Sequence, residues 1–265
     1  GASGMIAQQT NVDTIGNNLA NVNTTGFKAE TAEFKSLLYQ EIQTQTTSGN
    51  GEAKPVGAQV GLGTRVAATT SIFTQGNVTA TEVPTDFALE GDGFFALRGN
   101  DGGTYYTRNG AFTWSLNNAG QTILTDSSGN PVLDTRGNVI TVPNGVSAEK
   151  MNFSQDGAIG YYTAEGRYVA LNQTMAVYQF SNPTGLEKVS NSLLRATVNS
   201  GNPLLEGQTQ GLKPSKVCNG FLEGSNVKVA DEMVNLIVAQ RAYELNSKAI
   251  TTADSMLETA NNLKR

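Results

Sequence analysis

Residues 229–264 read VADEMVNLIVAQRAYELNSKAITTADSMLETANNLK, and this stretch decides the fold class. No glycine or proline interrupts it, and apolar residues recur every seven positions, which predicts one long α-helix. The recurring residues are Val229, Leu236, Tyr243, Ile250 and Leu257. We expect Ser225 or Asn226 to cap the start of this helix, because short polar side chains accept hydrogen bonds from its first free amides.

A second apolar stripe follows the same predicted helix and consists of Val238, Ala242, Leu245, Ala249, Ala253, Met256, Ala260 and Leu263. A single partner helix cannot cover both stripes. One interpretation is a helical hairpin formed within the chain. The other is that the second stripe packs against other subunits, and its alanines favour this one because small residues let helices approach closely in a dense bundle.

The amino end also predicts a helix that needs a partner. Its seam positions are spaced alternately by three and four residues, with one polar interruption at Gln8, and comprise Met5, Val12, Ile15, Leu19 and Val22. The seam ends at Asn23-Thr24-Thr25-Gly26, where the glycine can adopt the left-handed conformation that terminates helices.

The middle of the chain predicts β-hairpins. Short runs rich in β-branched and aromatic residues alternate with turn signals, such as Asn117-Asn118, Ser128-Gly129-Asn130, Arg136-Gly137-Asn138 and Asp156-Gly157. We therefore expect an α+β protein. Its terminal helices would form one discontinuous coiled-coil domain (1–35 and 220–265), followed by a connecting segment (36–75) with a polar arm at about 43–57, and by a hairpin-rich all-β domain (76–219).

Composition argues against several classes of function. The net charge of −5 and the lack of a basic stripe disfavour nucleic-acid binding, and no window of 18 apolar residues predicts membrane insertion. The chain has no histidine and a single cysteine, Cys218, which removes Ser-His-Asp and Cys-His catalysis and nearly every transition-metal site. We expect no enzyme activity, no metal and no cofactor.

Two motifs still suggest chemistry. Residues 91–96 read GDGFFA and match the G-x-G-x-x-A dinucleotide fingerprint, but no helix is predicted after them, so a hairpin turn is the better interpretation. The carboxylates of Asp86, Glu90 and Asp92 cluster in sequence and could serve a glycosidase, although a solvated turn explains them more simply.

Five stretches lie in the same order as the motifs of a known family. They read NNLANVNTTGFK (17–28), GDGFF (91–95), YTRNGAF (106–112), GSNVKVADEMV (224–234) and QRAYELNSKA (240–249). Together they resemble the flagellar rod and hook family over nearly the whole chain. The motif residues carried over are Asn17, Asn18, Asn21, Gly26, Phe27, Asn226 and Arg241. The asparagines near residue 20 either mark a frayed helix end or make interchain hydrogen bonds.

The resemblance implies a structural subunit that polymerises into a helical tube, with the terminal helices around an export channel. It implies a distal rod subunit in the flagellar basal body, which transmits torque to the hook, because the polar arm occupies the place of an insert typical of distal rod proteins. Other rod proteins, hook subunits, the P- and L-ring proteins and the type III export apparatus would be its partners. Export would need no cleaved signal peptide, and residues are expected ahead of Gly1. The alternatives are a hook or proximal rod subunit, or an exported peptidoglycan-cleaving enzyme.

Overall fold

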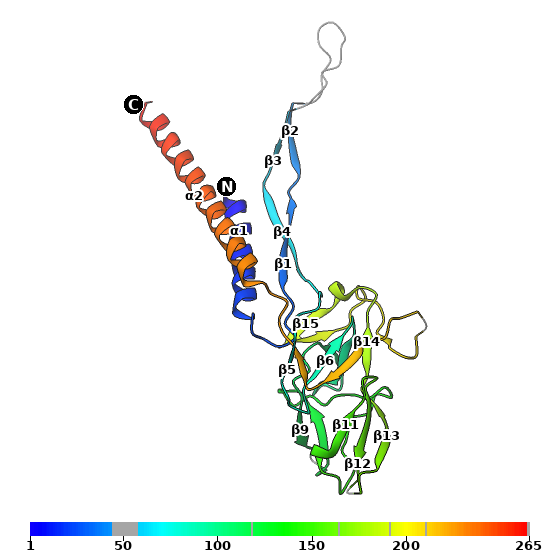
Figure 1. The fold of residues 1–265 in the computed structure, drawn as a ribbon. Coiled ribbons are helices and arrows are strands. Elements are labelled where there is room, and N and C mark those ends of the chain that lie inside the picture. The colour runs from blue at the N-terminus through cyan, green and yellow to red at the C-terminus, as the bar shows by residue number, and fades with distance from the viewer. Residues whose placement is uncertain (44–57, 118, 164, 191, 210, 264–265) are drawn as a thin grey trace. The chain divides into compact units, whose positions relative to one another are not determined.

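The computed structural model describes residues 1–265 except 44–57, 118, 164, 191, 210 and 264–265. Helix α1 (Ala2–Ala20) is the first element of the sequence and helix α2 (Val229–Asn262) is the last, with strands between them in chain order, which confirms the α+β class (Figure 1). Helix α2 agrees with the predicted range. Its N-cap is Lys228, which makes no side-chain capping bond, so the prediction that Ser225 or Asn226 caps it is wrong.

The chain divides into two compact units, each built from separate segments. The helical unit comprises Gly1–Ala20, Glu30–Ser71 and Lys228–Arg265, and the β-rich unit comprises Asn21–Ala29 and Ile72–Val227. These limits differ from the expected ones, because residues 36–71 join the helices, whereas residues 21–29, 72–75 and 220–227 join the strands.

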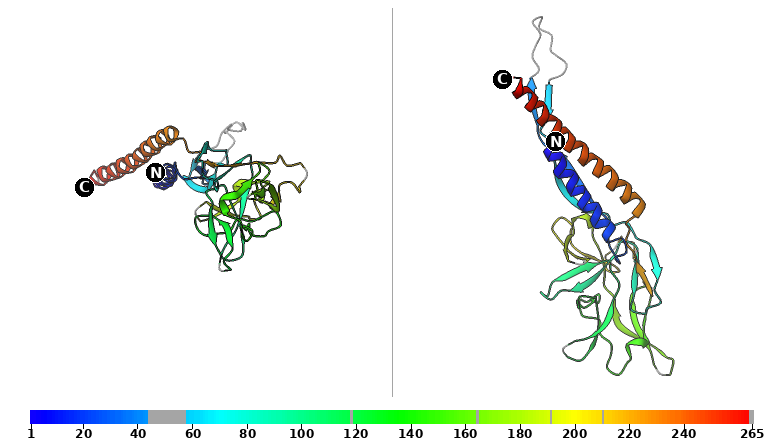
Figure 2. Two further views of the ribbon diagram at one scale, coloured as in Figure 1. Left: turned by 60° about the horizontal axis from the view of Figure 1, so that its bottom comes forward. Right: turned by 90° about the vertical axis from the view of Figure 1, so that its left-hand side faces the viewer.

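In the helical unit the two helices run antiparallel beside an extended β-ribbon (Figure 2). The ribbon consists of two antiparallel pairs, in which β1 (Glu30–Ser36) pairs with β4 (Thr64–Ser71) and β2 (Tyr39–Gln43) pairs with β3 (Ala58–Gly61). Most of the polar arm expected at 43–57 lies outside the described residues. A two-stranded ribbon is marginal in water by itself, and α1 contacts both β1 and β4.

The β-rich unit is built around a six-stranded sheet with the strand order β15-β16-β8-β7-β14-β17. Its strands are β7 (Phe94–Arg98), β8 (Thr104–Thr107), β14 (Val177–Gln179), β15 (Glu187–Ser190), β16 (Leu193–Arg195) and β17 (Leu204–Leu205). A three-stranded sheet contains β11 (Met151–Phe153), β12 (Ala158–Tyr162) and β13 (Tyr168–Thr174), and β9 (Thr113–Leu116) pairs with β10 (Thr122–Thr125). Two short 3₁₀ helices span Ala148–Lys150 and Pro183–Gly185.

The first and last strands of the β-rich unit pair with each other. Strand β5 (Val78–Ala80) pairs with β19 (Phe221–Glu223), and β6 (Phe87–Glu90) pairs with β18 (Lys216–Asn219). The unit is thus closed by residues that lie far apart in the sequence.

Two hydrophobic clusters fill the β-rich unit. The larger includes Phe87, Leu89, Phe95, Phe112, Leu124, Ile140 and Ile159, and the smaller includes Phe94, Tyr106, Ala176, Phe180 and Leu194. Their rings meet edge to face, as in the pair Phe95 and Phe112 with centroids 5.3 Å apart.

The hairpin turns reuse one local design, which explains the turn signals of the sequence. A side-chain oxygen of Asp126 accepts hydrogen bonds from the amides of Ser128 and Asn130, and Gly129 between them has a φ of +85°. Asn117 and Asp134 bind the amides two and four residues later in the same way. Glycine tolerates the left-handed conformation that each turn requires.

Candidate assembly surface

The interface between α1 and α2 is formed by small and medium side chains. Ala239 of α2 is 2% exposed and Ile15 of α1 is 5% exposed, while Leu236 is half-buried. The approach is close near the start of α1, because a Cβ added to Gly4 would lie 3.1 Å from the Asn246 side-chain amide. The first apolar stripe of α2 therefore faces α1 along part of its length.

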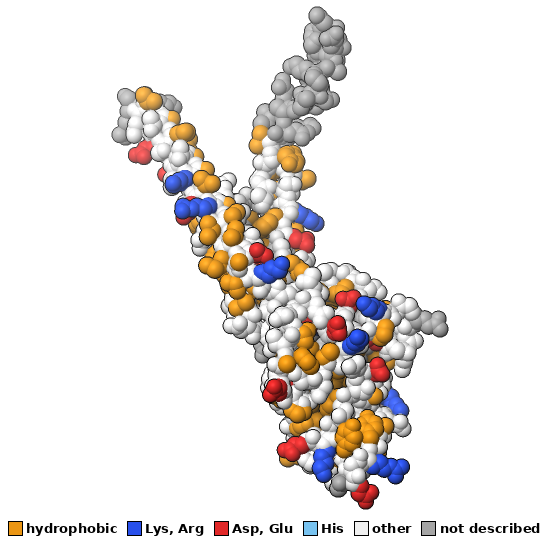
Figure 3. Space-filling view, in the orientation of Figure 1, with side chains coloured by type: hydrophobic (Ala, Val, Ile, Leu, Met, Phe, Trp, Pro, Cys, Tyr) orange, Lys and Arg blue, Asp and Glu red, His pale blue; other side chains and the backbone are white. Residues whose placement is uncertain are grey.

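The second apolar stripe of α2 remains largely uncovered within this chain. Val238, Leu245 and Met256 are 62%, 67% and 66% exposed, and Ala249 is exposed as well. Hydrophobic side chains follow the face of α2 that is visible in Figure 3. Burial of a leucine or methionine side chain contributes about 1.5–3 kcal/mol, so this open stripe favours association.

The predicted seam residues thus fall into groups. Ile15 is buried, whereas those that are half-buried are Met5, Val12, Leu19, Val22, Leu236 and Ala242. Val22 lies beyond the end of α1 at Ala20. The exposed members are Val229, Val238, Tyr243, Leu245, Ala249, Ile250, Met256 and Leu257. Ile250 is only 37% exposed, because its side chain packs near Gly1.

The asparagines of the amino-terminal motif serve contacts within the chain. Asn18 is 1% exposed, its Nδ2 donates to the Glu30 carbonyl oxygen at 2.8 Å, and its Oδ1 accepts from the Glu30 amide at 2.8 Å. This two-bond pairing ties α1 to β1, so Asn18 serves neither a frayed end nor an interchain bond. Asn17 donates to the Glu30 carboxylate at 3.3 Å, and Asn21 accepts from the Thr24 hydroxyl at 3.1 Å.

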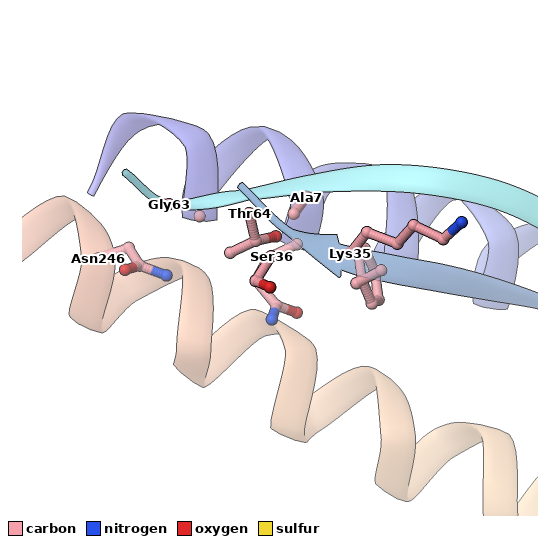
Figure 4. Close-up of a pocket in the computed structure, with 9 residues that line it drawn as sticks. Ala7, Lys35, Ser36, Gly63, Thr64 and Asn246 are labelled. Atoms are coloured by element: carbon pink, nitrogen blue, oxygen red, sulfur yellow. The ribbon is translucent and has the colours of Figure 1, made fainter. Parts of the chain in front are cut away.

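An open pocket of about 380 Å³ is lined by α1, α2 and the ribbon of the helical unit. Figure 4 shows Ala7 from α1, Ser36 and Thr64 from the ribbon and Asn246 from α2 around it, while Lys35 points away from Asn246. Its lining is small and mostly neutral. The pocket offers packing space rather than an arrangement of catalytic groups.

The β-rich unit contains a buried charge cluster that the sequence did not lead us to expect. The Glu223 carboxylate accepts a hydrogen bond from the Lys28 ammonium at 2.5 Å and from Arg108 Nη1 at 3.3 Å. The side chains of Lys28, Arg108 and Glu223 are 4%, 2% and 0% exposed. Burial lowers the pKa of the Lys28 ammonium, and the charge of Glu223 acts in the opposite direction.

Two further motif residues surround this cluster. Asn226 accepts from the Ala29 amide at 2.7 Å and donates to the Ile72 and Thr74 carbonyl oxygens at 2.8 and 3.1 Å. Gly26 has a φ of +68° and donates its amide to the Glu223 carbonyl oxygen at 2.8 Å. Gly26 thus serves a turn within the β-rich unit, since α1 ends at Ala20.

The remaining motif residues lie elsewhere. Half-buried Phe27 places its ring 5.4 Å from the Lys188 ammonium, and exposed Arg241 pairs with Glu244 at 2.7 Å on α2. The cluster around Glu223 was missed because its members are far apart in sequence. The cluster could have been suspected from the sequence, because Lys28 and Arg108 lie inside family motifs although only 15% of the residues of the chain are charged.

The motifs that suggested chemistry have structural roles. Residues 91–93 form the turn between β6 and β7, and the Gly93 amide donates to the buried Ser215 hydroxyl at 3.0 Å. Asp86 is 9% exposed before β6, whereas Glu90 and Asp92 are exposed. The described residues hold no group of three or more Cys, Asp or Glu side chains arranged to bind a metal. They also include no helix long and apolar enough to cross a membrane.

Comparison with known proteins identifies relatives over the full chain. Three family models match: the flagella basal body rod protein at residues 1–28, the flagellar hook protein FlgE/F/G D1 domain at 88–161, and the flagellar basal body rod FlgEFG protein C-terminal at 219–263. The flagellar basal-body rod protein FlgG of Borreliella burgdorferi is 43% identical over 100% of this chain and 97% of its own length. FlgG of Bacillus subtilis is 37% identical with the same coverage. The flagellar hook-basal body complex protein FlhP of Bacillus subtilis is 31% identical over 97% of this chain and 94% of its own length.

Proposed function

This chain belongs to the flagellar basal-body rod protein family and is a structural subunit of the basal body, and we propose that copies of it polymerise into the distal rod. The distal rod would act as a drive shaft that transmits torque to the hook and surrounds the export channel. The observation that carries the proposal is the apolar stripe of α2, which is largely uncovered by the described residues of this chain and is suited to helices of neighbouring copies.

The distal rod is favoured over the hook or the proximal rod by two observations. Relatives named FlgG are 37% and 43% identical to this chain, whereas the relative named as a hook-basal body complex protein is 31% identical. Residues 43–57 are polar and occupy the position at which the resemblance implies an insert typical of distal rod proteins. An exported peptidoglycan-cleaving enzyme is disfavoured, because Asp86 is buried while Glu90 and Asp92 are exposed, and no catalysis or cofactor is proposed.

The proposed partners follow from the position of a distal rod. They are other copies of the chain, further rod proteins, hook subunits, the P- and L-ring proteins and the flagellar type III export apparatus, which would pass the chain without a cleaved signal peptide. A single helix is marginal in water unless a partner covers its apolar face. We therefore propose that α2 becomes fully ordered when neighbouring copies cover its stripe.

The proposal is tested by placing a charge on the open stripe. Leu245→Asp introduces a carboxylate that would be buried on polymerisation, which costs several kcal/mol without a partner. Thr251→Asp is a matched control, because it places the same charge on an exposed position of α2 and threonine and aspartate have similar helix propensities. We expect Leu245→Asp to abolish polymerisation and Thr251→Asp to retain it, as measured by sedimentation and electron microscopy.

Folding of the β-rich unit is followed separately by the fluorescence of Trp114, the single tryptophan of the chain, which lies in β9. The signal should be native in both variants. Normal polymerisation of Leu245→Asp would contradict the helix-bundle assignment. Ile250→Asp should also block polymerisation, but with a loss of helix in the free chain, because Ile250 packs near Gly1 of α1.

A further inference from the structure

The buried charge cluster of the β-rich unit contains two cations and one carboxylate. Among the described residues, Glu223 is the only carboxylate in ion-pair contact with Lys28 or Arg108. Asp92 and Glu206 influence Arg108 only at longer range. Arg108 Nη2 donates to the Gly91 carbonyl oxygen, its guanidinium lies 5.2 Å from the Phe94 ring, and Lys28 donates to the Thr74 carbonyl oxygen. These groups carry no net charge and Arg108 Nε has no hydrogen-bond partner, so compensation of the two buried charges depends on the Glu223 carboxylate.

The carboxylate comes from a distant part of the chain. Glu223 lies 195 residues after Lys28 and 115 residues after Arg108. It is the last residue of β19, the final strand of the unit, which pairs with β5, the first. Glu223 Oε1 also accepts the Gly76 amide at 2.8 Å, and its carbonyl oxygen accepts the Gly26 amide at 2.8 Å.

We propose that Glu223 is a latch: the β-rich unit closes around Lys28 and Arg108 only when this residue, near the end of the unit's sequence, reaches them. Until then the edges of β5 and β6 are unpaired and both cations would be buried without a counter-charge. An uncompensated buried charge is strongly unfavourable. The segments of the β-rich unit that precede Glu223 therefore remain open until Glu223 is in place. The β-rich unit can therefore close only when nearly its whole sequence is present. This proposal does not depend on the assignment of the chain to the rod.

The test uses the full chain with the latch charge removed. Glu223→Gln keeps the volume but places an amide N–H group against cationic donors, and leaves two positive charges in the cluster. We expect the equilibrium constant for unfolding, followed by Trp114 fluorescence in denaturant, to rise by more than about 100-fold. Lys28→Met/Glu223→Gln leaves one positive charge, as in the native cluster, and should recover a large part of that loss.

The matched control is Glu187→Gln, which removes one carboxylate from an ion pair with Arg195 whose side chains are 52% and 53% exposed. This variant should change the constant by less than about fivefold. Hydrogen exchange follows the same loss in Glu223→Gln: the Gly26 and Gly76 amides, which bond to Glu223, should exchange faster, and so should the Leu133 amide, which bonds to Ala96 in the core, because the unit as a whole unfolds more often.

Three results would overturn the latch. Glu223→Gln could be as stable as Glu187→Gln, which would mean that the buried charge is not required for closure. Its Gly26 and Gly76 amides could exchange as in the native chain. If Glu223→Gln fails to fold, the Lys28→Met/Glu223→Gln variant is compared with it. Failure of the double variant to fold as well would assign the effect to packing and not to charge compensation.

Discussion

Gly110→Ala is expected to destabilise the β-rich unit, because the position has no room for a side chain. A Cβ added to Gly110 would lie 1.8 Å from the Phe87 carbonyl oxygen and 3.2 Å from the Phe95 ring. Both phenylalanines are 0% exposed, so neither can move aside without opening the core. The backbone segments must separate, which also breaks the 3.0 Å hydrogen bond from the Phe87 amide to the Gly110 carbonyl oxygen.

The magnitude follows from these contacts. Overpacking of a core costs about 1–3 kcal/mol, and a lost hydrogen bond adds about 0.5–1.5 kcal/mol, which together give about 1.5–4.5 kcal/mol. A unit of this size loses about 2–4 °C of Tm for each kcal/mol, so thermal unfolding followed by Trp114 fluorescence should shift down by roughly 5–15 °C.

The control separates steric overlap from backbone conformation. Gly129 has a φ of +85° and nothing within 4 Å of an added Cβ. Gly129→Ala should therefore cost only the left-handed conformation, about 1 kcal/mol, and lower Tm by about 2–4 °C. An equal or smaller shift for Gly110→Ala would refute the packing argument at Phe87.

Three further outcomes are expected. Asn18→Ala removes both hydrogen bonds that the Asn18 side chain makes with the Glu30 backbone, so the Glu30 amide should exchange at least about tenfold faster; unchanged exchange would contradict the role of Asn18 in tying α1 to β1. Burial and the nearby Glu90 charge raise the pKa of the Cys218 thiol, so less thiolate is present at pH 8.5 and iodoacetamide should react more slowly with the folded than with the unfolded chain; equal rates would count against this. Purified protein should release no muropeptides from peptidoglycan. Release that is lost when the carboxylates of Asp86, Glu90 and Asp92 are replaced would instead support the enzyme hypothesis.

The elements that were predicted well are those governed by local sequence. Helix α2 begins at Val229 as expected, because its periodicity is uninterrupted over many turns. The turns at 128–130 and 136–138 were predictable because glycine and a short polar side chain meet the local backbone requirement.

The features that were not predicted depend on distant contacts. Strands β2, β3 and β4 were expected to belong to a connecting segment (36–75), and β1 was expected to belong to the terminal-helix domain (1–35), since their alternation is weak and the strands pair across the polar arm. Asn226 was expected to cap α2 but instead binds backbone groups of residues 29, 72 and 74, which lie over 150 residues earlier. Local propensity contains no information on such pairings.

The predicted helix seams illustrate the same limit. Periodicity identified two stripes on α2, and the alanines of the second stripe favoured its packing against other subunits, but periodicity by itself contains no information on which stripe α1 covers. The structure resolves this through small residues, because Ala239 and Gly4 permit close helix contact on one side and leave Leu245 open on the other.

The central claim is that this chain builds the distal rod, and its most direct test is electron microscopy of basal bodies from a strain that lacks the gene. The account predicts structures that stop at a short rod and carry no hook, with full rods restored by the native chain. Basal bodies with a complete rod but no hook would place the protein in the hook instead, and intact basal bodies would contradict a structural role in the rod.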